Sequence, residues 1–151
     1  MKKDDFACVH PMRVRWAEVD MQGVVFNAHY LMYFDTAIAE YWRAISVGRE
    51  KEIADLYMRL YVVKATVEYH GSAHYDEMID VGCRVARVGR TSMAFQFAIW
   101  RGADHLISGE IVYVHAAPEE KKSAPIPDML KDAIVGYERT APDTAAAGVP
   151  R

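Results

Sequence analysis

The sequence predicts an α+β domain in which a five-stranded antiparallel sheet wraps around one long central helix. Three observations lead to this fold class. Residues 29–46 carry apolar side chains on nearly every side of a predicted helix, which therefore needs cover on most of its surface. Four runs of strand-like sequence follow it, and short turns join the last three, as in an antiparallel meander. The length of 151 residues suits a single core.

The first strand is predicted at residues 12–19, where polar and apolar residues alternate. The central helix follows over 29–46, with Asn27 as a suitable N-cap and Gly48 as a stop. Its apolar residues recur at spacings of three and four: Tyr30, Phe34, Ala37, Ile38, Tyr41 and Ile45. A polar connector over 49–58 separates this helix from the rest of the sheet.

The remaining strands are predicted from period-two patterns and the turns between them, at residues 61–70, 78–88, 93–101 and 105–115. A short amphipathic helix comes next, with Pro125 and Pro127 at its start. We expect residues 1–139 to form one domain and the small, proline-containing segment 140–151 to be a disordered tail.

Composition excludes several classes of protein. A net charge of −3 argues against nucleic-acid binding, which needs a basic surface. No stretch approaches the roughly 20 apolar residues of a membrane-spanning helix. The six histidines and two cysteines form no metal-binding motif, so no metal site is expected. The sequence has only two cysteines, which lie far apart, and its N-terminus does not look like a signal peptide. Both features favour a cytoplasmic location.

The stretch VDMQGVVFNAHY, residues 19–30, places one aspartate and one glycine directly before the long helix. Asp20 is ionised at neutral pH, and a turn at Gly23 would fold it back beside the helix start. There the unpaired N–H groups carry positive partial charge. By itself an aspartate in this position is more often a turn or cap residue than a catalytic one.

Residues 13–42 resemble the N-terminal signature of hotdog-fold acyl-CoA thioesterases of the 4-hydroxybenzoyl-CoA thioesterase family. Seven positions match the signature: Asp20, Gly23, Val24, Val25, Phe26, Asn27 and Tyr30. A weaker similarity covers residues 73–97, including a Gly-x-Thr-Ser turn at 89–92. The resemblance spans roughly residues 12–114, and the seven matches favour a catalytic role for the aspartate.

The resemblance implies hydrolysis of an acyl-CoA thioester to the free acid and coenzyme A. Asp20 would act as base or nucleophile, and the backbone N–H of Asn27 would polarise the thioester carbonyl. Gly23 would allow the turn and a close approach of the backbone, while Val24, Val25, Phe26 and Tyr30 would line the acyl pocket. The coenzyme A phosphates would lie against Arg87, Gly89, Arg90, Thr91 and Ser92. No cofactor is implied, because coenzyme A is part of the substrate.

Such a sheet leaves an open face and edges, and the family usually assembles dimers into tetramers, so we expect a homodimer that forms a homotetramer. Two alternatives keep this fold: an acyl-CoA-binding module without activity, and a thioesterase for acyl-carrier-protein thioesters. An (R)-specific enoyl-CoA hydratase is disfavoured, because Val25 stands where that family has a histidine five residues after the aspartate. His29, on the first helical turn, is expected to be a surface or hydrogen-bonded residue.

Overall fold

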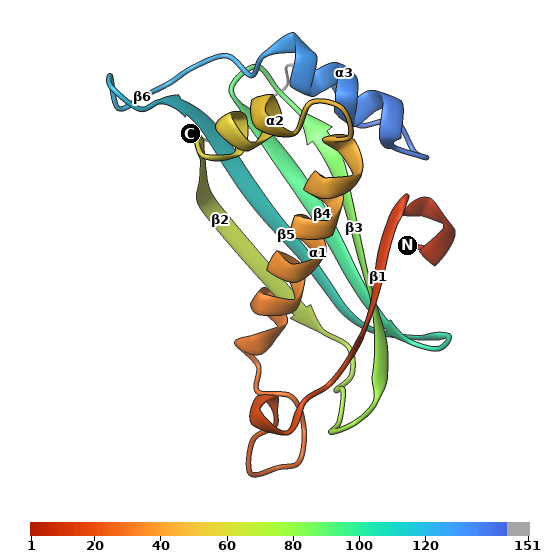
Figure 1. The fold of residues 1–151 in the computed structure, drawn as a ribbon. Coiled ribbons are helices and arrows are strands. Elements are labelled where there is room, and N and C mark those ends of the chain that lie inside the picture. Colours follow the sequence, from red (N-terminus) through yellow and green to blue (C-terminus); the bar gives the residue numbers. More distant parts are fainter. Residues whose placement is uncertain (145–151) are drawn as a thin grey trace.

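The computed structural model describes residues 1–144 and shows one antiparallel sheet curled around a long helix (Figure 1). The strands are β1 (Cys8–Arg13), β2 (Leu60–Tyr69), β3 (Met78–Val88), β4 (Ser92–Arg101), β5 (Asp104–Ala117) and β6 (Lys122–Ser123). The helices are α1 (His29–Ile45), α2 (Glu50–Tyr57) and α3 (Asp128–Tyr137), with single 3-10 turns at Lys3–Asp5 and Trp16–Glu18. The strand order β1-β3-β4-β5-β2, with β6 beside β5, confirms the predicted fold class.

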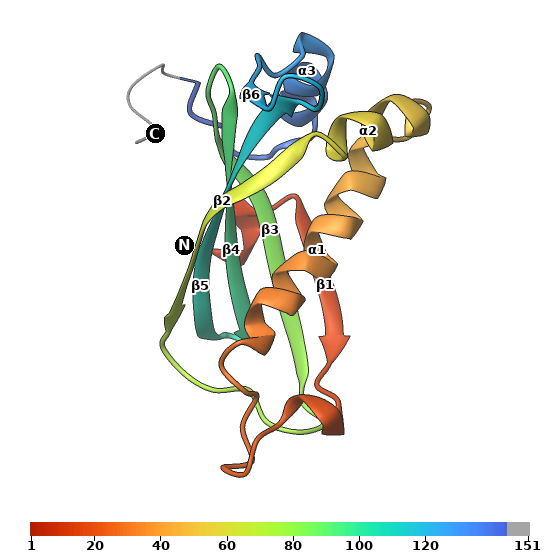
Figure 2. The ribbon, with the colours of Figure 1, turned by 90° about the vertical axis from the view of Figure 1, so that its left-hand side faces the viewer.

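Helix α1 lies across one face of the sheet, and Figure 2 shows the two layers from the side. Its rings fill the space between the layers: Phe34 stacks on Phe97 of β4, with ring centroids 4.4 Å apart. Gly109 of β5 makes this possible, because a Cβ there would collide with the Phe34 ring. Tyr41 is fully buried as well, so both rings belong to the core as predicted.

Strand β2 is an edge strand whose side chains are mostly exposed. It pairs with β5 on one side, and within residues 1–144 no strand pairs with its other side. Tyr61, Val62 and Val63 are each more than half exposed, although these residue types favour burial in sheets. An open, apolar edge of this kind is a surface on which another strand can pair.

The first strand lies earlier than predicted. β1 runs from Cys8 to Arg13, and the predicted strand at 12–19 instead contains a 3-10 turn at Trp16–Glu18. Pro11 lies inside β1, which is an edge strand next to β3. A proline is tolerated on an edge because its missing N–H can face the open side of the sheet.

The polar connector predicted at 49–58 is largely the helix α2. Its single buried side chain is Ile53, and the Tyr57 ring packs edge-on against Trp42 of α1, with centroids 5.6 Å apart. A helix of 8 residues with so few apolar contacts gives a weak periodic signal, which explains the error.

The segment after α3 returns to the sheet. The Asp143 N–H donates to the Ala86 carbonyl and the Val88 N–H donates to the Asp143 carbonyl, both at 2.9 Å. Of the predicted tail at 140–151, residues 145–151 lie outside the described part of the chain. No helix in residues 1–144 is long and apolar enough to cross a bilayer.

Candidate active site

Asp20 opens a tight hairpin before α1. The Asp20 N–H donates to the Val24 carbonyl at 2.9 Å, and the Gly23 N–H donates back to the Asp20 carbonyl at 3.0 Å. One carboxylate oxygen of Asp20 accepts the Gln22 N–H at 2.8 Å. Gly23 has φ +77°, which confirms the predicted glycine turn. No described atom lies near a Cβ built on Gly23, so this chain itself makes no close approach there.

The segment 72–77 stands between the Asp20 hairpin and α1, and it is bonded to both. The Val25 N–H donates to the Ala73 carbonyl at 2.9 Å, and Val24 forms a β-bridge with His74. The Ala73 N–H donates to the Tyr30 hydroxyl on the first turn of α1 at 3.1 Å. The hairpin and the helix start are therefore held in one hydrogen-bonded unit.

Asn27 precedes the helix but does not cap it. α1 begins at His29 with Ala28 at the N-cap position and no side-chain cap, so the prediction that Asn27 caps the helix is wrong by one residue. The Asn27 carbonyl accepts the Tyr69 hydroxyl of β2 at 3.1 Å. Within residues 1–144 the N–H groups of Asn27 and Ala28 donate no hydrogen bond, which leaves them available at the helix start.

Glu18 is a buried carboxylate that the sequence interpretation missed. Its side chain is 3% exposed and accepts the Arg15 backbone N–H at 2.7 Å, the Arg15 guanidinium and the Tyr33 hydroxyl of α1 at 3.1 Å. Burial by itself would raise the pKa of Glu18, but these donors hold it below its ordinary value. The Glu18 carbonyl accepts the Phe26 N–H at 2.9 Å, so this anchor ties the base of the hairpin to α1.

The residues predicted to line the acyl pocket differ in their exposure in the single chain. Val25 and Tyr30 are buried in the core, Val24 is half-buried, and Phe26 is 44% exposed beside His29. Burial raises the pKa of the Tyr30 hydroxyl, which therefore stays neutral at pH 7. Their role in substrate binding stays a prediction.

The residues predicted to bind coenzyme A surround the β3–β4 turn, but few side chains there are accessible. Ser92 is buried, Gly89 and Thr91 are half-buried, and Arg90 is exposed. Arg87 lies half-buried on β3, and within the described residues its Nε atom has no hydrogen-bond partner.

A groove of about 460 Å³ lies at the same end of the sheet, and sequence interpretation missed it. Four parts of the chain line it, namely β2, β5, the β5–β6 connection and β6, through Tyr61, Val63, Val114, Ala116, Ala117, Pro118, Lys121, Lys122 and Ser123. Val114 is the cross-strand partner of Ser92, so the groove adjoins the β3–β4 turn. The paired lysines were the available signal, since an exposed Lys-Lys beside an apolar groove suits an anionic ligand.

The two parts of the expected site lie at opposite ends of the sheet. Val14, at the start of the segment that leads to Asp20, bonds Glu77 beside the first residue of β3, whereas the β3–β4 turn follows its last residue. A strand of 11 residues spans about 33 Å at about 3.3 Å per residue. One chain therefore cannot place the predicted phosphate-binding residues next to Asp20.

No group of three or more His, Cys, Asp and Glu side chains in residues 1–144 is arranged to hold a metal ion. The described site contains a half-buried carboxylate, Asp20, in the hairpin that precedes α1, and two N–H groups at the helix start that have no acceptor among residues 1–144.

Comparison with known proteins identifies the family of this chain. The sequence profile of the Thioesterase-like superfamily matches residues 14–134. The acyl-CoA thioester hydrolase YbgC of Escherichia coli is 27% identical over 121 residues, which cover 80% of this chain and 90% of that protein. The acyl-CoA thioesterase YbgC of Haemophilus influenzae is 26% identical over 91 residues, covering 60% and 67%.

Solved structures share the fold. A Thermus thermophilus thioesterase, crystallised with coenzyme A and Zn, superposes with a TM-score of 0.79 at 23% identity, covering 89% of this chain and 96% of that one. A 1,4-dihydroxy-2-naphthoyl-CoA thioesterase from Synechocystis gives 0.72 at 22% identity, covering 84% and 94%. The profile match spans most of the sequence, and the chain therefore belongs to the Thioesterase-like superfamily, with the hotdog fold expected from its sequence.

Proposed function

We propose that this thioester hydrolase cleaves acyl-CoA to a free carboxylic acid and coenzyme A, with Asp20 as the reacting carboxylate. The observation that carries the proposal is the hydrogen-bonded unit formed by the Asp20 hairpin, segment 72–77 and the first turn of α1. It holds a carboxylate and the free N–H of Asn27 at one end of the molecule. The family match and the YbgC relatives support the same reaction class.

In one form of the proposed mechanism, Asp20 removes a proton from water, which attacks the acyl carbon. The Asn27 N–H donates to the thioester oxygen as negative charge grows on it, and the thiolate of coenzyme A leaves. In the other form Asp20 attacks the acyl carbon itself, and water then hydrolyses the resulting anhydride. Thiolate is a good leaving group, so neither form needs a strong general acid.

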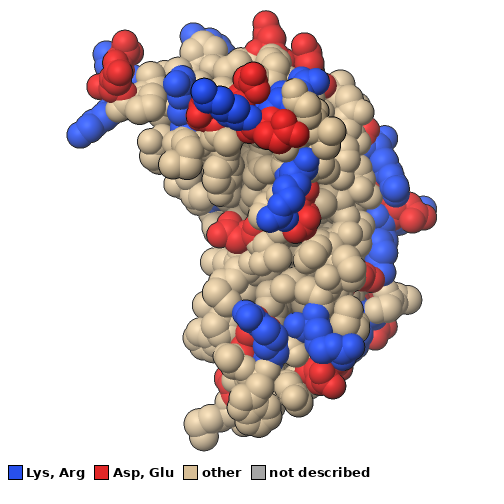
Figure 3. All heavy atoms as spheres, in the orientation of Figure 1, with Lys and Arg blue, Asp and Glu red and all other residues tan. Residues whose placement is uncertain are grey.

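We propose that two chains pair antiparallel along β2. Its free edge and its exposed Tyr61, Val62 and Val63 suit a second copy of the same strand in a two-fold dimer. Figure 3 shows the flank with β2 as a hollowed stretch bearing few charged atoms. Unpaired charged groups are costly to bury at an interface, and Lys64 of β2 is already paired with Glu110 of β5 at 3.2 Å.

Antiparallel pairing would resolve the separation between the two parts of the site. The Leu60 end of β2 carries the lysine groove, and the Tyr69 end contacts the Asn27 carbonyl. A two-fold axis near the strand centre would set the groove and β3–β4 turn of one chain beside the Asp20 hairpin of the other. Coenzyme A would then bind Arg87, Gly89, Arg90, Thr91 and Ser92, together with the lysines, of one protomer and react at its partner.

We further propose that these dimers associate into a homotetramer. No cofactor takes part in the proposed reaction.

We also propose a cytoplasmic location, which suits the two cysteines. Cys8 and Cys83 are cross-strand partners, yet both are buried free thiols. Burial raises the pKa of the Cys8 thiol to about 11, which keeps it protonated.

The test is a panel of short-chain, long-chain and aryl acyl-CoA thioesters, with the released thiol followed by a colour reagent. Matched acyl-carrier-protein thioesters are measured in parallel, and the binding of coenzyme A is measured by calorimetry. We expect turnover of at least one acyl-CoA. Faster turnover of the carrier-protein thioesters would mean that these, and not acyl-CoA, are the substrates. Tight binding of coenzyme A without any turnover would mean that the protein is a binding module and not an enzyme.

A further inference from the structure

Segment 72–77 is one of two links between the Asp20 hairpin and the start of α1, the other being the Glu18 anchor. Ala73 uses its carbonyl for Val25 and its N–H for Tyr30, and His74 bridges Val24. Every one of these contacts is a backbone contact of the segment. The position of Asp20 relative to the α1 start therefore depends on the backbone path of residues 72–77.

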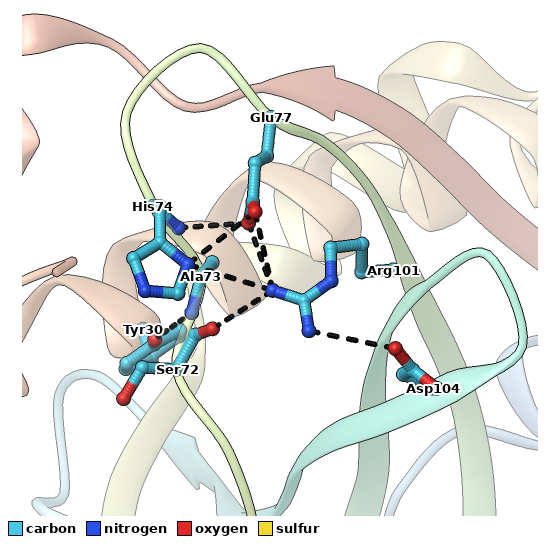
Figure 4. A network of polar contacts seen from close by, with 7 residues as sticks. All are labelled: Tyr30, Ser72, Ala73, His74, Glu77, Arg101 and Asp104. Atoms are coloured by element: carbon cyan, nitrogen blue, oxygen red, sulfur yellow. Dashed lines mark hydrogen bonds and ion pairs between the residues drawn. The ribbon is translucent and has the colours of Figure 1, made fainter.

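Arg101, the last residue of β4, holds that path (Figure 4). Its Nη1 atom donates to the Ser72 carbonyl at 3.2 Å and to the two Glu77 carboxylate oxygens at 3.2 and 3.1 Å. Glu77 Oε2 in turn accepts the His74 N–H at 2.8 Å. One guanidinium thus fixes both ends of the segment to a rigid strand of the sheet.

The surroundings of Arg101 are mostly acidic, and the group is only partly exposed. Its side chain is 34% exposed, Glu77 is 29% exposed, and Asp104 accepts from the second nitrogen, Nη2, at 3.4 Å. His74 Nδ1 lies 3.5 Å from Nη1. Partial burial works against the charge of Glu77, but the His74 N–H and Arg101 hold its pKa below the ordinary value, so the ion pair persists at neutral pH.

The contact of Arg101 with Asp104 (the outer contact) differs from its contacts with Ser72 and Glu77 (the inner contacts). Asp104 belongs to β5 and touches neither the hairpin nor α1 in the described hydrogen-bond network, whereas Ser72 and Glu77 delimit the segment that touches both. Arg101 therefore has one contact that only joins two neighbouring strands and several that fix segment 72–77. This division provides a matched control.

We propose that Arg101 is a positioning residue for the reaction: by fastening segment 72–77, it sets Asp20 against the N–H groups at the start of α1. The inference rests on the proposed function of that site. A planar guanidinium is needed because its nitrogens reach the Ser72 carbonyl, Glu77 and Asp104 at once, which a lysine ammonium cannot reproduce. A misplacement of about 1 Å between reacting groups can lower a rate about 100-fold.

The experiment compares Arg101→Gln, Arg101→Lys and Glu77→Gln with the control Asp104→Asn, which removes only the outer contact. For each folded variant, kcat and KM are measured on the best acyl-CoA substrate. We expect kcat to fall about 10- to 100-fold in Arg101→Gln with KM nearly unchanged. Arg101→Lys and Glu77→Gln should lie between it and wild type, and Asp104→Asn should match wild type.

A second measurement does not depend on activity. Hydrogen–deuterium exchange of the Val25 and Ala73 amides should accelerate in Arg101→Gln and Glu77→Gln but not in Asp104→Asn. A purely structural role would lower the melting temperature without this local pattern and without the selective loss of kcat.

The possible failures are distinguishable. Wild-type protein that hydrolyses no thioester would overturn the proposed function and this inference together. Active wild type with an unaltered kcat in Arg101→Gln, or equal losses in Arg101→Gln and Asp104→Asn, would overturn only the role of Arg101. If Arg101→Gln does not fold, Glu77→Gln decides by the same two criteria.

Discussion

The two ends of the sheet are built differently. At the α1 start, short backbone contacts and two acid–arginine pairs, Glu18 with Arg15 and Glu77 with Arg101, fix the Asp20 hairpin from two sides. Around the β3–β4 turn and the adjoining apolar groove the exposed side chains are long and charged: the basic Arg90, Lys121 and Lys122, and the acidic Glu119 and Glu120. The polar groups at the α1 start are held by hydrogen bonds, whereas the charged side chains around the β3–β4 turn and the groove are long and exposed.

This difference matches two tasks in one proposed reaction. Groups that act on the reacting carbonyl need fixed positions, because their benefit arises only in the transition state. Groups that hold a distant phosphate need charge more than position, and the same contact serves substrate and transition state alike. The separation of about 33 Å within a chain then makes pairing along β2 part of the function.

The largest effect is expected from Asp20→Asn. The amide keeps an oxygen for the Gln22 N–H and so preserves the turn, but it can neither remove a proton nor attack carbon. We expect kcat to fall about 1,000-fold with the fold intact, measured by thiol release and circular dichroism. Asp35→Asn, on the exposed side of α1, is the control, and equal activity of both variants would remove Asp20 from the mechanism.

The proposed dimer brings the two ends of the sheet together, and Ala65→Glu, near the centre of β2, should disrupt it. Two-fold pairing would bring two such glutamates close together, and like charges on facing strands repel. We expect light scattering to show monomers, with kcat/KM at least about 100-fold lower, since each site would lose its partner's groove. Ala103→Glu, in the exposed β4–β5 turn, should change neither quantity; an active monomer of Ala65→Glu would refute the composite site.

The end of the sheet at the β3–β4 turn is tested by the double variant Arg90→Gln, Lys122→Gln. If these side chains hold phosphates, KM for acyl-CoA should rise about 10-fold while kcat stays constant. The wild-type KM should also rise with salt, more steeply than that of the double variant, because exposed charges are screened. Arg43→Gln on α1 provides the comparison, and a loss of kcat in place of binding would contradict this assignment.

The smallest effect is expected at the buried anchor of the fixed end. Glu18→Gln should lower the free energy of unfolding by about 1–3 kcal/mol at pH 7, because a carboxylate that accepts four hydrogen bonds from Arg15 and Tyr33 is lost. Folding lowers the pKa of Glu18. The charged side chain therefore stabilises the folded protein at any pH above the ordinary pKa of a glutamate, and this stabilisation is lost as the pH falls through the lowered pKa. The difference between variant and wild type should therefore shrink below about pH 4.

Glu40→Gln removes a similarly spaced pair with Arg43 on the surface of α1, where both side chains are partly exposed. Chemical denaturation should show almost no change there, since exposed ion pairs contribute little. Equal losses in the two variants would mean that burial of Glu18 has no bearing on the stability of the hairpin.

Local patterns predicted the elements that bury many side chains. The helix at 29–46 and the strand at 78–88 have strong periodicity, and the structure has α1 at His29–Ile45 and β3 at Met78–Val88. α2 and β1 were misassigned because one buries a single side chain and the other contains Pro11 on an edge. β2 is the exception, since its period-two pattern predicted a strand at 61–70 and the strand runs from Leu60 to Tyr69 although its side chains are mostly exposed in the single chain.

By itself the sequence determined the fold class, the glycine turn at Gly23 and the family of the protein, because periodicity and a short spaced motif are properties of neighbouring residues. Only the tertiary structure decided that Glu18 is buried, that Arg101 fastens segment 72–77, and that the β3–β4 turn lies at the far end from Asp20. These facts depend on contacts between residues that are far apart in the sequence, such as Arg101 and Glu77, and the periodicity of a short stretch does not say which distant residues meet.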